Sequence, residues 1–498
     1  MTVTPLKHIV FVTGPIWTHV RPGVKFCARL AEKFPNAYIS IYTFGPTSGQ
    51  PTTYLATLSE AARSRVRIVP SMVDIPIASP LDMIFSMDKS FKSWITEQVA
   101  VSSFEANGNV VAPPSWIIED HINGGCSLGN GLPVVSWWVA PAASMIQHFG
   151  NPEHGHGGRL FDKILDELAN QEPGSEKSTV EVFHEVLSDR VVCIPGLPPY
   201  YEYEQIPQMN PDFMPLTVQL HKRWNVMRDQ MEIAVLSCNL EMEPIAVQAC
   251  ATAFTKPVRV FEVGPAADLP STTLAPQSDA TIDFLDKSYS ELGPHSVVYI
   301  AFGTMFFPLP QSAQHLEIIL EEIIASGFRL VFSLSSEQAA LSEKFMQEMT
   351  HEGKAIFPKW TQQLQVLEHP ATHYFMSHGG WNSTSEAIMR GVPMIFWPFA
   401  GDQPTNTMQV TSQHDCGFEL RQVRTGPAKR PAYPNVAVIG TEEAVRDEIK
   451  DILEMSKGSR GRQQRANMRA LGQVMRDSIA KGGSGDVALG EFGKLIGL

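Results

Sequence analysis

Residues 377–386 have the composition of a site for a negatively charged ligand. They read SHGGWNSTSE, with an apolar strand pattern before them and the helical pattern 387–390 after them. Glycines let a ligand approach the backbone closely, and the amides at a helix N-terminus point toward negative charge. Ser383 and Glu386 also have the spacing of a capping box, which any helix can use. Capping does not explain the glycine pair or His378, so the pattern favours an anion such as a diphosphate.

A histidine and an aspartate in the first half of the chain could act together as a general base. His19 follows the apolar stretch 9–12 near the start of a helical pattern. A helix N-terminus disfavours imidazolium, which keeps the ring able to take a proton. Such a base needs a carboxylate that fixes its tautomer, and Asp120 and Glu119 end another strand pattern. Side chains alternate along a strand, so only one of these two acids can face the base.

These residues follow short apolar segments that have the pattern of buried strands. Strands alternate with helical stretches, which predicts parallel sheets covered by helices, with ligands at the carboxyl ends of the strands. A polar segment rich in Pro and Ser follows Gly264 and reaches about residue 278, and it separates two series of strands. The fold class is therefore α/β with two doubly wound halves. The predicted strands are 8–12, 37–43, 66–69 and 115–119, then 297–302, 329–333, 355–357, 374–376 and 394–396.

Composition and charge restrict the possible partners. The 498 residues are enough for two or three domains. A net charge of -13 without a run of Lys or Arg argues against nucleic acid and against an anionic membrane surface. The six cysteines form no C-x-x-C pair, which indicates reduced thiols and no zinc site. Residues 1–6 lead directly into a strand, and no run of about 18 apolar residues occurs. We expect a cytoplasmic monomer without an integral membrane segment.

The segment 360–403 carries the most specific pattern. His378 falls 18 residues after Trp360, Glu386 falls 26 after it, and Gln403 closes a segment of 44 residues. In these separations the segment resembles the donor-binding signature box of family 1 UDP-glycosyltransferases, best known from plant natural-product enzymes. The resemblance covers most of the chain, but only the box is specific.

The resemblance implies a GT-B fold, in which two doubly wound, Rossmann-like domains face each other across a cleft. Residues 1–264 would bind the acceptor and supply the base, 265–475 would bind the UDP-sugar, and the helix in 476–498 would return to the first domain. The donor residues implied by the resemblance are Trp360 on the uracil, Thr361 at its edge, Gln363 and Glu386 at the ribose, Thr304, His378, Trp381, Asn382 and Ser383 around the diphosphate, and Asp402 and Gln403 on the sugar.

The implied reaction is an inverting, metal-independent transfer of a hexose from a UDP-sugar to a hydroxyl or other nucleophile, with no cofactor. His19 would be the base, assisted by Asp120. In the family, a glutamine at the end of the box, here Gln403, accompanies donors of the glucose type. Many members have Thr or Ser where this chain has Val139, whose side chain cannot bond a sugar hydroxyl. Ser144 or a backbone group could replace it, and UDP-xylose or UDP-N-acetylglucosamine stay open as donors.

The acceptor is expected to be a small lipophilic or phenolic molecule. The candidate pocket residues are apolar or aromatic and could equally pack the core: Met83, Phe85, Trp138, Val139, Pro199 and Tyr200. Two other function classes stay open. One is a UDP-sugar-binding protein without turnover, and the other is a dinucleotide oxidoreductase. The absence of G-x-G-x-x-G after the first strand argues against the second.

Overall fold

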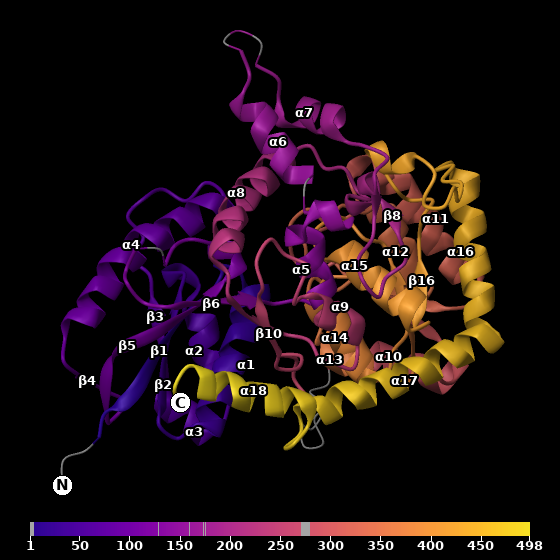
Figure 1. Cartoon of the computed structure of the whole chain (residues 1–498). Helices are drawn as coiled ribbons and strands as arrows, with labels where there is room; N and C mark the ends of the chain where they lie inside the picture. Colours follow the sequence, from indigo (N-terminus) through magenta and orange to yellow (C-terminus); the bar gives the residue numbers. More distant parts are fainter. Residues whose placement is uncertain (1–3, 128, 159, 173, 175, 270–278) are drawn as a thin grey trace. The chain divides into compact units, whose positions relative to one another are not determined.

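The computed structural model describes residues 4–127, 129–158, 160–172, 174, 176–269 and 279–498. The chain forms two compact units (Figure 1). Unit 1 consists of Met1–Val186, Asp212–Ala267 and Asp477–Leu498, and unit 2 of Leu187–Pro211 and Asp268–Arg476. The predicted domain limits at 264 and 475 stay a prediction, and they differ from these units chiefly in the segment Leu187–Pro211. Of the expected linker, residues 270–278 lie outside the described part of the chain.

Unit 1 is built on a sheet of eight strands in the order β10-β9-β6-β5-β1-β2-β3, with β4 paired to β5. All pairs are parallel except β4 with β5. The strands are β1 (Leu6–Val12), β2 (Ala37–Thr43), β3 (Val66–Pro70), β4 (Phe104–Ala106), β5 (Asn109–Asp120), β6 (Val134–Trp138), β9 (Ile233–Leu236) and β10 (Arg259–Glu262). The helices are α1 (Trp17–Lys33), α2 (Gly49–Ala56), α3 (Glu60–Arg65), α4 (Pro80–Ala100), α5 (Ala142–Phe149), α6 (Leu160–Ala169), α7 (Thr179–Val186), α8 (Met214–Gln230), α9 (Pro244–Ala249) and α18 (Ser484–Leu495).

Unit 2 is built on a parallel sheet of six strands in the order β13-β12-β11-β14-β15-β16. The strands are β11 (Val297–Ala301), β12 (Arg329–Ser333), β13 (Ala355–Ile356), β14 (Thr372–Ser377), β15 (Met394–Phe396) and β16 (Gly417–Glu419), with a separate hairpin of β7 (Val191–Val192) and β8 (Tyr200–Tyr201). The helices are α10 (Ala280–Leu292), α11 (Ala313–Ala325), α12 (Glu343–His351), α13 (Gln363–Glu368), α14 (Trp381–Arg390), α15 (Gln403–Met408) and α16 (Glu442–Lys457), and α17 (Ser459–Ile479) leads back into unit 1.

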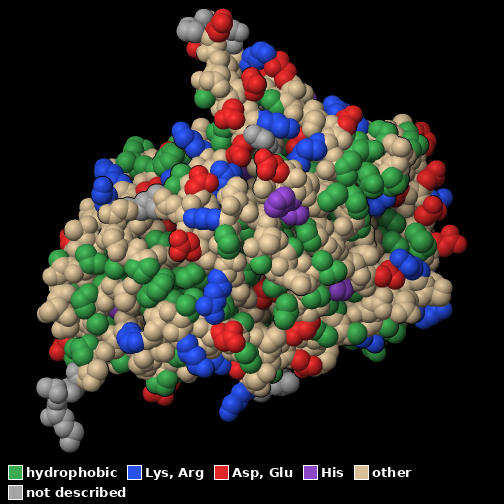
Figure 2. Space-filling view, viewed as in Figure 1, with side chains coloured by type: hydrophobic (Ala, Val, Ile, Leu, Met, Phe, Trp, Pro, Cys, Tyr) green, Lys and Arg blue, Asp and Glu red, His purple; other side chains and the backbone are tan. Residues whose placement is uncertain are grey.

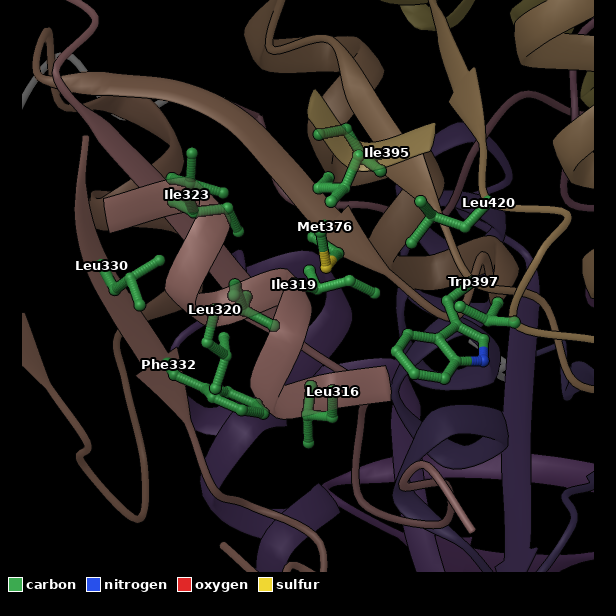
Figure 3. Packing of buried hydrophobic residues seen from close by; sticks show 14 of the residues in the cluster. Leu316, Ile319, Leu320, Ile323, Leu330, Phe332, Met376, Ile395, Trp397 and Leu420 are labelled. Carbon is green, nitrogen blue, oxygen red and sulfur yellow. The ribbon is translucent and has the colours of Figure 1, made fainter. Parts of the chain in front are cut away.

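Each sheet has its own apolar core. In unit 2, side chains of α11 such as Leu316 and Ile319 pack on Phe332 and Met376 of the sheet (Figure 3). In unit 1, α1 and α18 pack on the sheet around Phe11 and other buried side chains. These two parallel sheets confirm the predicted α/β class with two doubly wound halves, and all nine predicted strands are present.

Acidic and basic side chains are interspersed over the visible face (Figure 2). In the described ranges, no helix is both long enough and apolar enough to cross a membrane.

Candidate active site

In unit 2, the chain turns tightly between β14 and α14, and the glycine pair makes this turn possible. Gly379 has a φ of +88°, and a Cβ on it would lie 3.0 Å from the ring of Phe396. A Cβ on Gly380 would lie 2.5 Å from Nε2 of His378. The two glycines therefore let the imidazole lie against the start of α14. Backbone amides and the helix dipole make this end of the helix favourable for an anion.

His378 is a buried, neutral imidazole at that helix end. Burial lowers the pKa of His378 to about 4. Its Nδ1 lies 3.3 Å from the hydroxyl oxygen of Ser377, and a hydroxyl that donates there leaves the ring proton on Nε2. Phe306 stacks on the ring. A Cβ on Gly303 would lie 3.0 Å from the ring, so the turn that carries the exposed Thr304 also borders His378.

The capping-box interpretation of Ser383 and Glu386 is wrong. The helix begins at Trp381 with Gly380 as its N-cap, so both residues lie inside it. The amide of Trp381 instead donates to Oδ2 of Asp402 at 3.2 Å. Glu386 is buried and accepts a hydrogen bond of 2.7 Å from Nε2 of Gln363. Both side chains thus belong to a polar network and not to a helix cap.

Tyr299 extends this network and was missed from the sequence. Its hydroxyl lies 2.8 Å from Oγ1 of Thr361 and donates to Oε1 of Gln363 at 3.2 Å. The ring stacks on Phe375 at 4.8 Å, and burial raises the pKa of the phenol well above its usual range. A single polar ring in the otherwise apolar strand β11 was the signal that could have identified it.

Trp360 is 65% exposed, so its side chain is not part of the core. A large indole ring in solvent near the start of α13 is available for stacking. Asp402 and Gln403 lie at the start of α15. Gln403 is buried, and its Oε1 accepts from the amide of Phe399 at 2.8 Å and from that of Ala400 at 3.4 Å. The side-chain oxygen of Gln403 therefore holds the loop before α15. The side-chain NH2 group is the part of Gln403 that could contact a ligand.

In unit 1, His19 and Asp120 form a close pair. The strands β1 and β5 are parallel neighbours, with Val12 opposite Glu119, so their carboxyl ends meet. Nδ1 of His19 lies 3.0 Å from both carboxylate oxygens of the buried Asp120. Burial raises the pKa of Asp120, but His19, His121 and the amide of Ile122 outweigh it and hold the pKa below its usual value.

The adjacent carboxyl has different partners. Glu119 accepts from the amide of Cys126 at 2.9 Å and from the hydroxyl of Ser127, and burial raises the pKa of Glu119 to about 7. The alternation along β5 thus separates the two acids as predicted. A Cβ on Gly14 would lie 3.1 Å from Cβ of His19, so this glycine permits the close approach of the turn after β1.

Comparison with known proteins identifies the kind of enzyme that this chain resembles. Residues 247–421 match the family model described as UDP-glucoronosyl and UDP-glucosyl transferase. UDP-glycosyltransferase eriJ of Hericium erinaceus is 25% identical over 466 residues, which cover 89% of each chain. The chain is a UDP-glycosyltransferase that is similar to the family 1 enzymes. It is an enzyme that transfers a sugar from a UDP-sugar to a small acceptor. This excludes the two alternatives of a binding protein without turnover and a dinucleotide oxidoreductase.

Two further relatives of the glycosyltransferase extend the comparison. An anthocyanidin 3-O-glucosyltransferase of Gentiana triflora is 25% identical over 513 residues, which cover 97% of this chain and 96% of the relative. The fold is similar to that of a UGT transferase from Siraitia grosvenorii solved in complex with UDP, with a TM-score of 0.72, 20% identity, and coverage of 98% of this chain and 99% of that one. These comparisons confirm the predicted fold class.

The candidate acceptor residues of the glycosyltransferase lie in both units. In unit 1, Trp138 is buried in an aromatic cluster, Val139 and Met83 are half-buried, and Phe85 is exposed. In unit 2, Tyr200 is buried and Pro199 exposed, and both line a cavity of about 70 Å³. The structure therefore groups these six residues in two sets, and their role in acceptor binding stays a prediction.

Ser144 is not available to replace the hydroxyl that Val139 lacks. It is buried, its hydroxyl donates to the carbonyl of Pro141 at 2.7 Å, and it accepts from Nε1 of Trp138 at 2.9 Å. The single proton of the hydroxyl is thereby used within unit 1.

Proposed function

We propose that this glycosyltransferase transfers glucose from UDP-glucose, with inversion, to a hydroxyl of a small lipophilic or phenolic acceptor. His19 is the general base and Asp120 is its partner. The observation that carries this proposal is the 3.0 Å contact of Nδ1 of His19 with both oxygens of a buried carboxylate. The printed name of the Gentiana relative, a 3-O-glucosyltransferase, supports glucose as the donor sugar and a hydroxyl as the acceptor group.

The two nitrogens of the His19 ring have different tasks. Nδ1–H of His19 donates to Asp120, which leaves the lone pair of Nε2 for the acceptor hydroxyl. As Nε2 takes the proton, the acceptor oxygen bonds to the anomeric carbon, and the bond from that carbon to the β-phosphate oxygen breaks. The carboxylate of Asp120 stabilises the imidazolium that forms. Attack opposite the leaving diphosphate inverts the anomeric configuration.

Residues of unit 2 bind the donor and stabilise the leaving group. The N-terminus of α14, with His378 and the side chains of Asn382 and Ser383, provides hydrogen-bond donors and a favourable dipole for the diphosphate. This arrangement supports transfer without a metal ion. Trp360 stacks on the uracil, where a planar face contributes about 1–3 kcal/mol.

The ribose and the sugar are bound next to the diphosphate. Gln363 and Glu386 accept hydrogen bonds from the ribose hydroxyls. Asp402 and the side-chain amide of Gln403 form hydrogen bonds with the hydroxyls of glucose. Thr304 borders the phosphates beside His378. Because Val139 offers no hydroxyl, UDP-xylose and UDP-N-acetylglucosamine are the competing donors.

The base assignment is tested by three substitutions. We expect His19→Ala and Asp120→Asn to lower kcat by about 10²- to 10⁴-fold, because the first removes the base and the second removes the carboxylate that holds its tautomer and stabilises the imidazolium. UDP affinity, measured by calorimetry, should stay within about twofold, since the UDP-binding residues lie in unit 2. The matched control is Glu119→Gln, which changes the neighbouring buried carboxyl and should retain most of the rate. Wild-type turnover of His19→Ala would refute the assignment.

The donor is tested by competition of UDP-glucose, UDP-xylose, UDP-galactose and UDP-N-acetylglucosamine over a panel of phenolic acceptors. We expect UDP-glucose to have the highest kcat/KM, by about tenfold or more, as one additional well-placed hydrogen-bonding group allows. A higher kcat/KM for UDP-xylose would assign the site around Val139 to a pentose instead.

A further inference from the structure

Three side chains of the kinds that bind metal ions converge at the carboxyl end of β5. One nitrogen or oxygen atom from each of His19, Asp120 and His121 lies within 4.8 Å of the others. His121 directly follows Asp120 and begins the short 3-10 helix His121–Asn123. All three residues belong to unit 1, so the group is complete within one compact part of the chain.

His121 provides a second, independent observation. Its Nδ1 is buried and makes no hydrogen bond, although its nearest recorded polar contact is Oδ1 of Asp120 at 3.5 Å. The residue is only 7% exposed, and its ring packs 4.2 Å from that of Trp138 and 5.4 Å from that of Trp224. Buried ring nitrogens nearly always have a partner. Here the nitrogen without one faces the carboxylate that His19 also contacts.

The distances match the coordination sphere of one small ion. Zinc binds imidazole nitrogen and carboxylate oxygen at about 2.0–2.2 Å, which separates two ligands of a tetrahedral ion by roughly 3.3 Å. The contacts to Asp120 are 3.0 Å from His19 and 3.5 Å from His121. Two imidazoles and one carboxylate are a ligand set for zinc and similar divalent transition ions, and the fourth position is left for water.

We infer that His19, Asp120 and His121 form a binding site for one divalent transition-metal ion of the zinc class, and that this ion inhibits the enzyme. Coordination takes the lone pair of Nδ1 of His19, and the proton that Nδ1 carried passes to solvent. The ion also neutralises the charge of Asp120. The inhibition, unlike the binding, rests on the proposed role of His19 as base, because a ring beside a cation resists protonation.

A second group of potential ligands in unit 1 is less suited to an ion from solvent. Cys238, Glu243 and Glu262 also lie within 4.8 Å of one another, but all three are buried. Glu243 already accepts from the amides of Ala142 and Ala143 at 2.7 and 2.9 Å, at the start of α5. His19 retains 12% side-chain exposure, so the first group is the one that solvent reaches.

Binding is tested without any assay of transfer, using Co²⁺ as a spectroscopic probe of the chelator-treated full-length protein. We expect one Co²⁺ per chain with visible ligand-field absorption, displaced by Zn²⁺. His121→Phe keeps an aromatic ring in the cluster and removes one ligand, and it should weaken Co²⁺ binding by about 10- to 100-fold or more. His148→Phe is the matched control, because His148 packs on the same Trp138 without belonging to the group. This variant should bind Co²⁺ like the wild type.

Inhibition is measured as the fraction of each protein's own metal-free rate. Zn²⁺ should lower kcat with little change in KM for the donor, and the half-inhibiting Zn²⁺ concentration should rise at least about tenfold in His121→Phe but not in His148→Phe. Absence of the Co²⁺ spectrum from the wild type, or its retention in His121→Phe, would overturn the metal site. If the spectrum behaves as expected but His19→Ala retains wild-type turnover, the base assignment fails while the metal site stands.

Discussion

The hydroxyl of Tyr299 illustrates how single side chains organise the proposed donor site of this glycosyltransferase. It connects Thr361 to Gln363, and Gln363 in turn donates to Glu386. Each group in this network fixes the orientation of the next, so the position of the carboxylate is set before the ribose binding that we propose for it. The network thus reduces the entropy that a mobile glutamate would lose on binding.

We expect Tyr299→Phe to raise KM for the UDP-sugar by about three- to tenfold, the effect of one hydrogen bond worth about 1 kcal/mol, with kcat within about twofold. The matched control is Tyr374→Phe in the adjacent strand β14. The hydroxyl of Tyr374 donates to Gln464 of α17, which is not among the residues proposed to bind the UDP-sugar. Steady-state kinetics with varied donor checks this. An equal rise of KM in both variants would show that Tyr299 acts only through general stability.

Some residue-level features could be predicted from the sequence and others could not. Alternation along β5 correctly predicted that only one of Asp120 and Glu119 contacts His19, because that rule depends only on strand geometry, whereas the choice of Asp120 came from the family resemblance. The capping box failed since helix starts are uncertain by a few residues, and α14 begins before Ser383. The buried contacts of Ser144 were unpredictable, because they depend on where Trp138 and Pro141 lie in three dimensions.

At the scale of elements, the segment Leu187–Pro211 is the least expected part of the fold. It lies in the first half of the sequence but belongs to unit 2. The amide of Gln208 donates to the carbonyl of Phe399 at 3.1 Å, beside the loop held by Gln403, and the amide of Met209 donates to Oγ1 of Thr425 at 2.8 Å. The segment contains only a short hairpin and a 3-10 turn. No periodic pattern identified its partner, so Pro199 and Tyr200 in this segment were predicted to belong to the acceptor pocket of the first domain.

A buried ion-pair network anchors this segment. Arg424 lies 2.7 Å from Glu204 of the segment and 2.7 Å from Glu419 of β16. Arg424→Met should lower the free energy of unfolding by about 3 kcal/mol, since it leaves the buried carboxylate of Glu204 without its cation and leaves Glu419 with Arg421 alone. Arg430→Met is the control, because Arg430 is 44% exposed and its pair with Asp189 should contribute about 0–1 kcal/mol. Urea denaturation measures both, and equal losses would refute the network's role.

At the scale of the whole molecule, the chain passes between its two units at residues 187, 212, 268 and 477. The short apolar segments correctly predicted the α/β class and nine of the strands, because buried parallel strands have a strong local signal in a sequence. Strand β6, of five residues, was missed, and so were the shorter strands β4, β9, β10 and β16, because three or four residues carry little pattern. The passage at 187–211 was missed for a different reason. It is fixed by hydrogen bonds to residues about two hundred positions away.

Hydrogen exchange can establish which unit this passage follows when it unfolds. At about 100 times its Kd, UDP should stabilise the unit that binds it by about 2.7 kcal/mol. We propose that this is unit 2, so the amides of β14 should gain that protection. The amides of Gln208 and Met209 should gain it with them, because their acceptors, Phe399 and Thr425, belong to unit 2. The amides of β1 are the control for unit 1. If Gln208 and Met209 responded like β1 and not like β14, the segment would unfold with the first half of the chain, and the boundary at 264 predicted from sequence would describe the cooperative units better than the contacts do.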